Sequence, residues 1–330
     1  MKRRHFLALL GGAAASTIRS PLTAADPNRR FRRVGILLST AATDPQAQTN
    51  LAAFSKGLDD LGWRDHVRLE IRWGLGQGAQ ARVAAKEIVD LAPEVILVGG
   101  GGTAAVVRDE TRTIPTVFVG FTDPIAGGMA ESLARPGRNI TGFTSVEFSV
   151  GGKWLELLKD LSPEVKRVAA IFNPETVPHG TEFLRSSKSV AGSLGIDLVG
   201  VPVGDEAEIR AAITGLARER ASGLMVMPDP FNSTHKGLII GLAVECRVPA
   251  IYPSRSYAMA GGLLSYGAEL PYVYRQAAGY IDRILRGARP GDLPVQAPNK
   301  FELVVNLKTA KLMGTEISPT LLAIADEVIE

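Results

Sequence analysis

The sequence predicts an α/β protein of two Rossmann-like lobes, each with a parallel sheet, joined by a hinge that the chain crosses several times. Three observations support this fold class. Strand and helix patterns alternate from Arg33 onward, and the same order of elements occurs in both halves of the chain. The 330 residues, 45% of them hydrophobic, suffice for two separate cores. One continuous doubly wound sheet is the less favoured alternative, since it does not explain the repeat.

Residues 1–25 have the composition of an export signal, with a basic start, a short apolar middle and small residues near Ala24. The apolar part is too short to span a bilayer, and R-R-H-F-L at 3–7 has the twin-arginine form. We expect cleavage, with a retained membrane anchor as the alternative. Because the segment holds four basic residues and no acid, cleavage changes the formal charge from +3 to −1. The charge of the mature chain therefore does not argue for a nucleic-acid partner.

In the first half, a continuous apolar run at 34–38 predicts a strand buried on both faces. Apolar residues at helical spacing predict a helix over about 46–61 that ends at Gly62. The remaining elements continue the alternation: a strand at 68–73, a helix at about 79–91, a strand at 94–100, a helix at about 103–111 and a strand at 114–120.

The second half repeats this order. A proline opens one strand in each half, at IPTVFV and VPAIYP, where its missing N–H does least harm. The predicted elements are a strand at 167–173, a helix at about 181–194, a strand at 197–203, a helix at about 206–219, a strand at 223–229, a helix at about 234–245 and a strand at 248–254.

After residue 260 the pattern changes, and the tail is expected to return to both lobes. An amphipathic helix is predicted at 271–287, and a strand followed by a helix at 300–314. Crossings between the lobes are expected at 139–148, 265–267 and 294–298. The resulting domains are a signal at 1–25, an N-terminal lobe of 31–143 plus about 268–295, and a C-terminal lobe of 144–267 plus about 296–330.

The loops that follow the strands hold the candidate ligand contacts, because ligands of parallel α/β sheets bind beyond the carboxyl ends of the strands. Hydroxyls, amides and backbone N–H groups dominate these loops. Such groups suit the binding of a small zwitterion or polar organic molecule better than they suit catalysis. The predicted ligand-binding residues are Ser39, Thr40, Gly101, Gly102, Thr103, Thr122, Asp123, Asn173, Asp229 and Tyr257.

The stretch VGGGGTA at 98–104 places four glycines between a strand and a helix. A Walker A motif is absent because no lysine follows Gly102, and the match to G-x-G-x-x-A lies in the third βα turn rather than the first, which disfavours a dinucleotide. Exposed N–H groups at a helix start, with the Thr103 hydroxyl, favour a carboxylate instead. The alternative is that the glycines have no ligand role and only allow the helix to start close to the strand.

Two Asp-Pro dipeptides, at Asp123 and Asp229, are assigned to opposite lobes. Each aspartate is either a turn or helix N-cap residue or a counter-charge for a ligand ammonium. We expect Asp229 to hold the ammonium, because it lies opposite the glycine loop. A flat apolar ligand could also stack on aromatic side chains in or beside these loops. These aromatic residues are Phe121, Phe143, Phe148, Tyr257 and Tyr266.

The sequence contains few signatures of an enzyme. The three histidines after the predicted signal, His66, His179 and His235, are scattered without metal-ligand spacing, and neither a metal nor a cofactor is expected. Ser265 in GLLSYG is one residue off a nucleophile elbow. Cys246, the single cysteine, has no histidine nearby and is expected to be a small buried hydrophobe. No catalytic residue is therefore predicted.

Motifs along nearly the whole chain carry a family resemblance: AAFSKGLDDLGW at 52–63, TDPIAGGMAESLARPGRNITGFT at 122–144, GGKWLELLKDLSP at 151–163, IFNPET at 171–176, and the tail segments at 272–314 and 321–330. With these motifs the chain resembles the ABC-transporter substrate-binding proteins of the type I periplasmic-binding fold, a family that includes tryptophan- and tyrosine-binding members. The resemblance implies an exported receptor with a ligand between its lobes. It implies ligand contacts at Ser39, Thr103, Thr122, Asp123, Asn173 and Asp229.

One departure from the family pattern lies in the glycine loop. Relatives commonly have N-G-T-x-A where this chain has GGGGTA, so the resemblance implies only backbone contacts from Gly100 to Gly102.

The sequence therefore predicts an exported, monomeric solute-binding protein. It would capture an amino acid or related carboxylate, aromatic ones included, and deliver it to an ABC permease. Ligand would shift the population toward a closed form. A periplasmic sensing module for a signalling partner is the first alternative. A cleft enzyme, either a hydrolase or nucleotide-dependent, is the second. A sugar-responsive repressor core is disfavoured by the export signal and by the missing DNA-binding headpiece.

Overall fold

The computed structural model describes residues 31–75, 78–144, 149–177 and 180–330. The predicted export signal, Phe148 and His179 lie outside the described residues.

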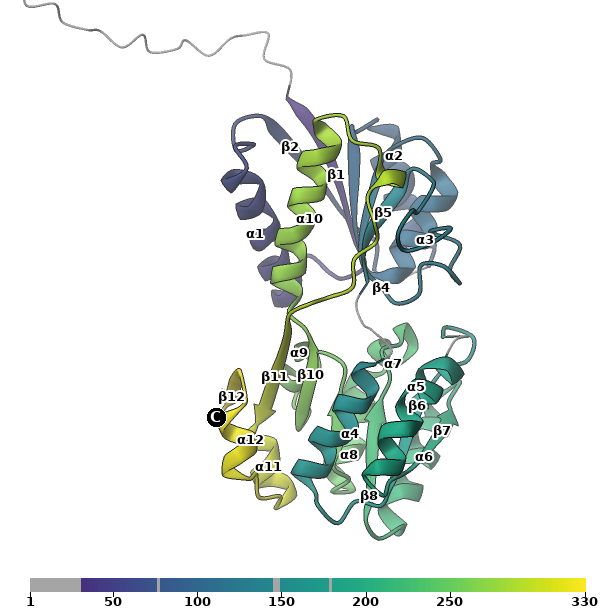
Figure 1. Cartoon of the computed structure of the whole chain (residues 1–330), viewed down its shortest axis with the longest axis vertical. Helices are drawn as coiled ribbons and strands as arrows, with labels where there is room; N and C mark the ends of the chain where they lie inside the picture. Colours follow the sequence, from purple (N-terminus) through teal and green to yellow (C-terminus); the bar gives the residue numbers. More distant parts are fainter. Residues whose placement is uncertain (1–30, 76–77, 145–148, 178–179) are drawn as a thin grey trace, which may run out of the picture.

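The first lobe is a five-stranded parallel sheet in the order β2-β1-β3-β4-β5 (Figure 1). Its apolar strands are buried because helices pack on both faces. The strands are β1 (Arg32–Leu38), β2 (Val67–Trp73), β3 (Val95–Gly99), β4 (Thr116–Phe121) and β5 (Ile140–Thr144). The helices are α1 (Pro45–Asp60) and α10 (Leu270–Leu285) on one face, and α2 (Ala79–Asp90) and α3 (Gly101–Glu110) on the other.

The second lobe has a seven-stranded sheet in the order β12-β11-β10-β9-β8-β6-β7, parallel except for the antiparallel pair of β10 and β11. The strands are β6 (Arg167–Phe172), β7 (Asp197–Pro202), β8 (Ser222–Val226), β9 (Ala250–Tyr252), β10 (Leu264–Ala268), β11 (Phe301–Asn306) and β12 (Glu327–Ile329). The helices are α4 (Val150–Leu161), α5 (Gly180–Ser193), α6 (Glu206–Arg218), α7 (Pro230–Thr234), α8 (Lys236–Glu245), α9 (Arg255–Met259), α11 (Leu307–Met313) and α12 (Pro319–Ala323).

The predicted fold class is confirmed: the structure has two mostly parallel sheets, and the alternative of one continuous sheet is wrong. The helix predicted at about 234–245 corresponds to α8, and the prediction missed a separate short helix before it, α7, which Asp229 caps and Pro230 opens. The predicted first crossing begins with a strand, since β5 pairs with β4 at the edge of the first sheet.

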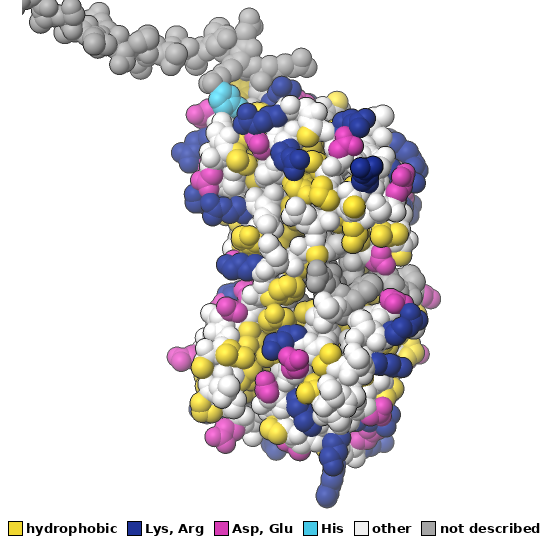
Figure 2. Space-filling model, in the orientation of Figure 1, with side chains coloured by type: hydrophobic (Ala, Val, Ile, Leu, Met, Phe, Trp, Pro, Cys, Tyr) yellow, Lys and Arg dark blue, Asp and Glu magenta, His cyan; other side chains and the backbone are white. Residues whose placement is uncertain are grey.

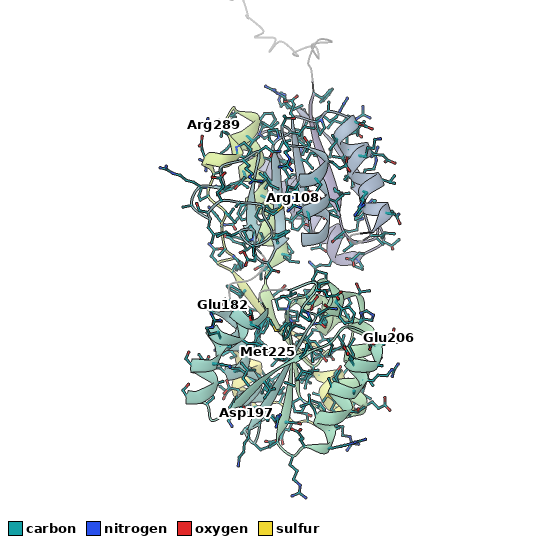
Figure 3. The ribbon with its side chains drawn as sticks, turned by 90° about the vertical axis from the view of Figure 1, so that its right-hand side faces the viewer. Arg108, Glu182, Asp197, Glu206, Met225 and Arg289 are labelled. Carbon is teal, nitrogen blue, oxygen red and sulfur yellow. The ribbon has the colours of Figure 1, made fainter. Side chains whose placement is uncertain are left out.

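Each lobe is held by hydrophobic clusters on both faces of its sheet. In the second lobe Met225 lies fully buried at the centre (Figure 3). Trp154 of α4 is also fully buried, and its Nε1–H donates to the carbonyl of Tyr266 over 2.7 Å. This indole therefore fixes α4 to β10, the strand that leads into the first lobe.

Two passages within the described residues join the lobes. β10 runs directly into α10 of the first lobe, and β11 returns beside it (Figure 1). Lys300 Nζ binds the Glu269 carboxylate at 2.6 Å where these two passages meet. The returning chain is also tied to β5, because Thr144 N–H donates to Gln296 O over 2.9 Å. The hinge is thus a set of connected strands.

The carboxyl ends of β1 to β5 point toward the second lobe, and those of β6 to β10 point toward the first. β1 begins at the far end of the upper lobe and runs toward the lower one, and the other strands of its sheet are parallel to it (Figure 1). In the lower lobe α7, which follows β8, lies at the end that faces the upper lobe (Figure 1). Figure 2 shows a narrowed waist between the lobes at this level.

Candidate functional site

Ser39 and Thr40 directly follow β1. The backbone N–H of Ser39 donates to Gly99 O over 3.0 Å, which ties the ends of β1 and β3 together. The Thr40 hydroxyl oxygen is shielded from solvent and has no hydrogen-bond partner within the described part of the chain. Because buried polar atoms are almost always bonded, this hydroxyl is a group that a bound molecule could satisfy.

Packing requires the first two glycines of the loop. A Cβ at Gly99 would collide with the Tyr274 hydroxyl and with Leu38, and a Cβ at Gly100 would collide with Ser39 Oγ. Gly100 also has a φ of +99°, which residues with a side chain rarely adopt. Gly99 and Gly100 are therefore explained by packing, because the helix starts close to the strand, as the alternative predicted.

Gly101 and Gly102 belong to α3, so the helix begins two residues earlier than predicted. The N–H of Gly100 donates to Val119 O, but no side chain caps the first turn, which contains the N–H groups of Gly101, Gly102 and Thr103. First-turn N–H groups have no partner within a helix and carry partial positive charge. The start of α3 is therefore a place where an anion is stabilised.

The predicted role of the Thr103 side chain needs correction. Thr103 is 0% exposed, and its Oγ1 lies 3.0 Å from Gly99 O and 2.9 Å from Gly100 O, to which it donates. Threonine readily makes such local bonds to backbone carbonyls. In this structure the hydroxyl holds the glycine loop in place and does not face an anion at the start of α3.

Thr122 and Asp123 form a turn after β4. The Asp123 carboxylate accepts from the N–H groups of Ile125 at 3.1 Å and Ala126 at 2.9 Å, the pattern of an aspartate turn. Arg108, which Figure 3 shows in the first lobe, donates to the carbonyl of Gly127 and so holds the far side of the turn. Asp123 thus has the turn role that was the alternative to a ligand contact.

Asp229 is the most constrained polar side chain of the second lobe. It is 3% exposed, and its carboxylate accepts from Asn173 N–H at 2.6 Å, Thr176 Oγ1 at 2.6 Å and Phe231 N–H at 2.8 Å. It is therefore the N-cap of α7, as one alternative predicted. All three donors are neutral, and among the described residues no lysine or arginine forms an ion pair with this carboxylate. A cationic group is the partner that it lacks.

Asn173 directly follows β6 and is 5% exposed. Its Oδ1 accepts from the N–H of Glu175 at 2.8 Å, which closes the turn that presents its backbone N–H to Asp229. The loops after β6 and β8 are therefore held as one rigid unit.

Tyr257 of α9 is 2% exposed, and its ring stacks on Tyr252 with centroids 5.3 Å apart. Burial raises the pKa of the Tyr257 phenol, so the hydroxyl stays neutral. That hydroxyl lies near Ser233, whose own hydroxyl donates to Asp229 O, and makes no hydrogen bond of good geometry among the described residues. The ring of Tyr257 belongs to the core, and only its hydroxyl is left for another partner.

Sequence reasoning did not identify Thr176 or Tyr274. Thr176 was not among the predicted site residues, although its hydroxyl donates to Asp229. The Asn-Pro-Glu-Thr turn at 173–176 is the sequence feature that could have indicated it. Tyr274 lies in a helix far along the chain, and only the fold brings its hydroxyl against Gly99.

Two surface hollows lie away from these loops, at the amino ends of the strands. One of about 450 Å³ is lined in part by Cys246, which is half-buried rather than buried as predicted. The other, of about 850 Å³, is lined in part by Trp63 and Arg286. There Asp282 accepts from both Trp63 Nε1 at 2.7 Å and Arg286 at 2.6 Å, so these groups already have partners.

Among the described residues, no group of three or more His, Cys, Asp or Glu side chains could hold a metal ion. His235 packs its ring on Phe231, with centroids 4.2 Å apart. None of the helices in the described ranges is both long and apolar enough to cross a bilayer.

Known proteins share this sequence pattern and fold. A curated relative, the tyrosine-binding protein of Clostridioides difficile (strain R20291), is 24% identical over 291 residues, which are 88% of this chain and 83% of the relative. A conserved domain protein from Vibrio cholerae O1 biovar eltor has a TM-score of 0.79 and 25% identity, covering 91% of this chain and 100% of its own. The ABC domain from Streptococcus pneumonia in complex with L-Trp also has a TM-score of 0.79, with 21% identity and the same coverage.

The match to a family extends over most of the chain. The sequence profile of the ABC transporter substrate binding proteins aligns with residues 38–329, which include every candidate loop and every strand after β1. The chain therefore belongs to the ABC transporter substrate-binding protein family.

Proposed function

We propose that this chain is an exported receptor that captures an amino acid or a related carboxylate between its lobes and passes it to an ABC permease. Aromatic amino acids are the first candidates, because one relative is a tyrosine-binding protein and one structural neighbour was solved with L-Trp. The observation that carries the proposal is the buried carboxylate of Asp229, which has neutral donors only.

The ligand carboxylate would bind at the start of α3. The N–H groups of Gly101, Gly102 and Thr103 lie in a helix turn without a side-chain cap, and glycine at the first two positions leaves the backbone open. A carboxylate there is stabilised by the partial positive charge of the helix end. The buried hydroxyl of Thr40, on the adjacent strand end, is available as a further donor.

The ligand ammonium would bind at Asp229 on the other lobe. A buried carboxylate that has no cation gains most from a positively charged partner. The Tyr257 hydroxyl, which also lacks a partner, would be a second acceptor for the ammonium beside the Asp229 carboxylate. Opposite charges on the two ends of an amino acid would thus bind opposite lobes.

A ligand held by both lobes favours the form in which both contacts are made. The size of this population shift equals the difference in binding free energy between the closed and open forms. A permease that recognises the closed form would therefore select the loaded receptor. The twin-arginine-like start of the sequence supports export.

The proposal is tested with full-length protein expressed with its export signal and purified from the periplasmic fraction. Thermal unfolding is recorded with each of the twenty common amino acids, and with ATP and NAD as controls. A ligand at about 100 times its Kd stabilises by about 2.7 kcal/mol. We expect stabilisation by amino acids, aromatic ones foremost, and calorimetric titration then measures the Kd. Stabilisation by nucleotides alone would show that the proposal is wrong.

A further inference from the structure

Gly101 differs from the two glycines before it because the fold does not require it. A Cβ built on Gly101 would lie 3.6 Å from Phe121 Cδ2 and 3.8 Å from Gly120 O, which are ordinary van der Waals distances. Its φ is not in the left-handed region, unlike that of Gly100. An alanine would therefore fit at this position.

An alanine at position 101 would also favour the helix. Glycine is a poorer helix former than alanine, by up to about 1 kcal/mol in a helix interior and by less at the first residue. Gly101 is the first residue of α3 and is partly exposed, so neither packing nor burial opposes a methyl group. What the missing side chain provides is space beside the uncapped N–H groups.

Phe121 borders that space. Its ring is fixed on two other sides, by an edge contact with Phe118 at a centroid distance of 5.9 Å and by Gly127, where a Cβ would come within 2.5 Å of the ring. Phe121 remains partly exposed. The Cδ2–Cε2 edge of the ring lies on the side of Gly101, and no side chain from position 101 covers it.

We propose that Gly101 and Phe121 together form the subsite for the side chain of the ligand and select a flat, apolar one. This inference rests on the proposed function. A carboxylate on the first-turn N–H groups places the next carbons of the ligand beside Gly101, where a Cβ would otherwise be. Those carbons then contact the Phe121 ring, and an aromatic side chain gains a ring–ring contact there.

The test compares Gly101→Ala with the unaltered chain, using L-tryptophan, L-tyrosine and L-phenylalanine as probes in calorimetric titration. A methyl group in the subsite should raise the Kd about 10- to 200-fold. The melting temperature should be unchanged or higher, since the substitution suits the helix. Gly279→Ala in α10 is the matched control, because a Cβ there meets no atom within 4 Å and the position lies outside the candidate loops. It should leave the Kd unchanged.

A double-mutant cycle tests whether the two residues act as one subsite. Phe121→Leu removes the ring–ring contact and should raise the Kd about 2- to 12-fold. In the double variant the smaller leucine leaves room for the methyl group, so the combined effect should be less than the product of the two. If the Kd of the double variant rises by the full product of the two single effects, the inference is overturned.

The outcomes separate this inference from the proposed function. If the unaltered chain binds no amino acid, the proposed function fails. If it binds amino acids but no aromatic one, or if Gly101→Ala binds an aromatic probe within twofold of the unaltered chain, only the subsite is wrong.

Discussion

The hydroxyl of Thr176 donates a 2.6 Å hydrogen bond to Oδ1 of Asp229 and so joins the loop after β6 to the loop after β8. The other oxygen of Asp229 accepts from Asn173 N–H at the same distance. Both oxygens are thus oriented by the protein before any ligand arrives. Groups that are already in place lose less entropy on binding, which favours affinity.

We predict that Asp229→Asn weakens binding of a zwitterionic amino acid about 30-fold or more. The reason is that losing one partner of a buried charge pair costs about 2–5 kcal/mol. The variant should also lose about 1 kcal/mol of stability, because an amide nitrogen replaces one of the oxygens that accept from Asn173 and Phe231. Calorimetric titration and urea unfolding measure the two effects.

Thr176→Val is the matched control for Asp229. It removes one hydrogen bond and leaves the charge, so we expect a loss of about 1 kcal/mol in stability and less than about fivefold in affinity. If both variants lose affinity equally, Asp229 acts only as a structural cap.

Substitution of Thr103 separates a structural role from a direct ligand contact. Thr103→Val keeps the shape, including the methyl group that packs against Gly74, but removes the hydroxyl's bonds to Gly99 O and Gly100 O, which still accept from the N–H groups of Ser39 and Ala104. We expect about 1 kcal/mol lower stability in urea, the usual net contribution of one hydrogen bond when its acceptors keep other donors. Thr103→Ser keeps the hydroxyl and should retain most of that stability. A variant Thr103→Val that is as stable as the unaltered chain but binds no ligand would instead support a direct contact.

The fold was predictable from the sequence because strand and helix patterns are local, and because parallel sheets bind ligands at one defined edge. The roles of individual side chains were less predictable from the sequence. The direction of the Thr103 hydroxyl depends on carbonyls that accept it only once Gly100 adopts its positive φ. The cap role of Asp229 was foreseen as an alternative, but its bond to Asn173 joins residues 56 positions apart.

The start of α3 was misplaced for a physical reason. Glycine is a poor helix former, so Gly101 and Gly102 resembled loop residues in the sequence. In the structure α3 packs against β3 and β4, and this tertiary contact overrides the local preference. The same contact explains why Gly99 and Gly100 are required and Gly101 is not.

We predict that Gly100→Ala destabilises the protein by about 3 kcal/mol or more. A side chain at its φ of +99° is strained by about 1–3 kcal/mol, and the added Cβ would also collide with Ser39. Gly195→Ala is the control, because Gly195 has a φ of +65° but open space around it, so only about 1 kcal/mol of strain is expected. Equal unfolding midpoints in urea for the two variants would show that the contact with Ser39 carries no cost.

Buried tyrosines should make the protein lose stability at alkaline pH. Burial raises the pKa of Tyr252, Tyr257 and Tyr274 above the ordinary value of 10.0. Above that pH the unfolded chain releases these protons while the folded chain keeps them, so the unfolded state gains. Each such group lowers the free energy of unfolding by about 1.4 kcal/mol per pH unit until its folded pKa is reached.

Tyr257→Phe tests this linkage and the ligand role of the hydroxyl together. At neutral pH we expect stability to be unchanged or higher, because the hydroxyl that is removed is buried without a partner and the phenylalanine ring still stacks on Tyr252. Between pH 10 and 11.5 the variant should lose stability less steeply than the unaltered chain, by about one group's contribution. Urea unfolding at several pH values, with tyrosinate absorbance as a second probe, measures the slope. An identical slope would mean that Tyr257 ionises in the folded state, and an unchanged amino-acid Kd would remove its hydroxyl from the site.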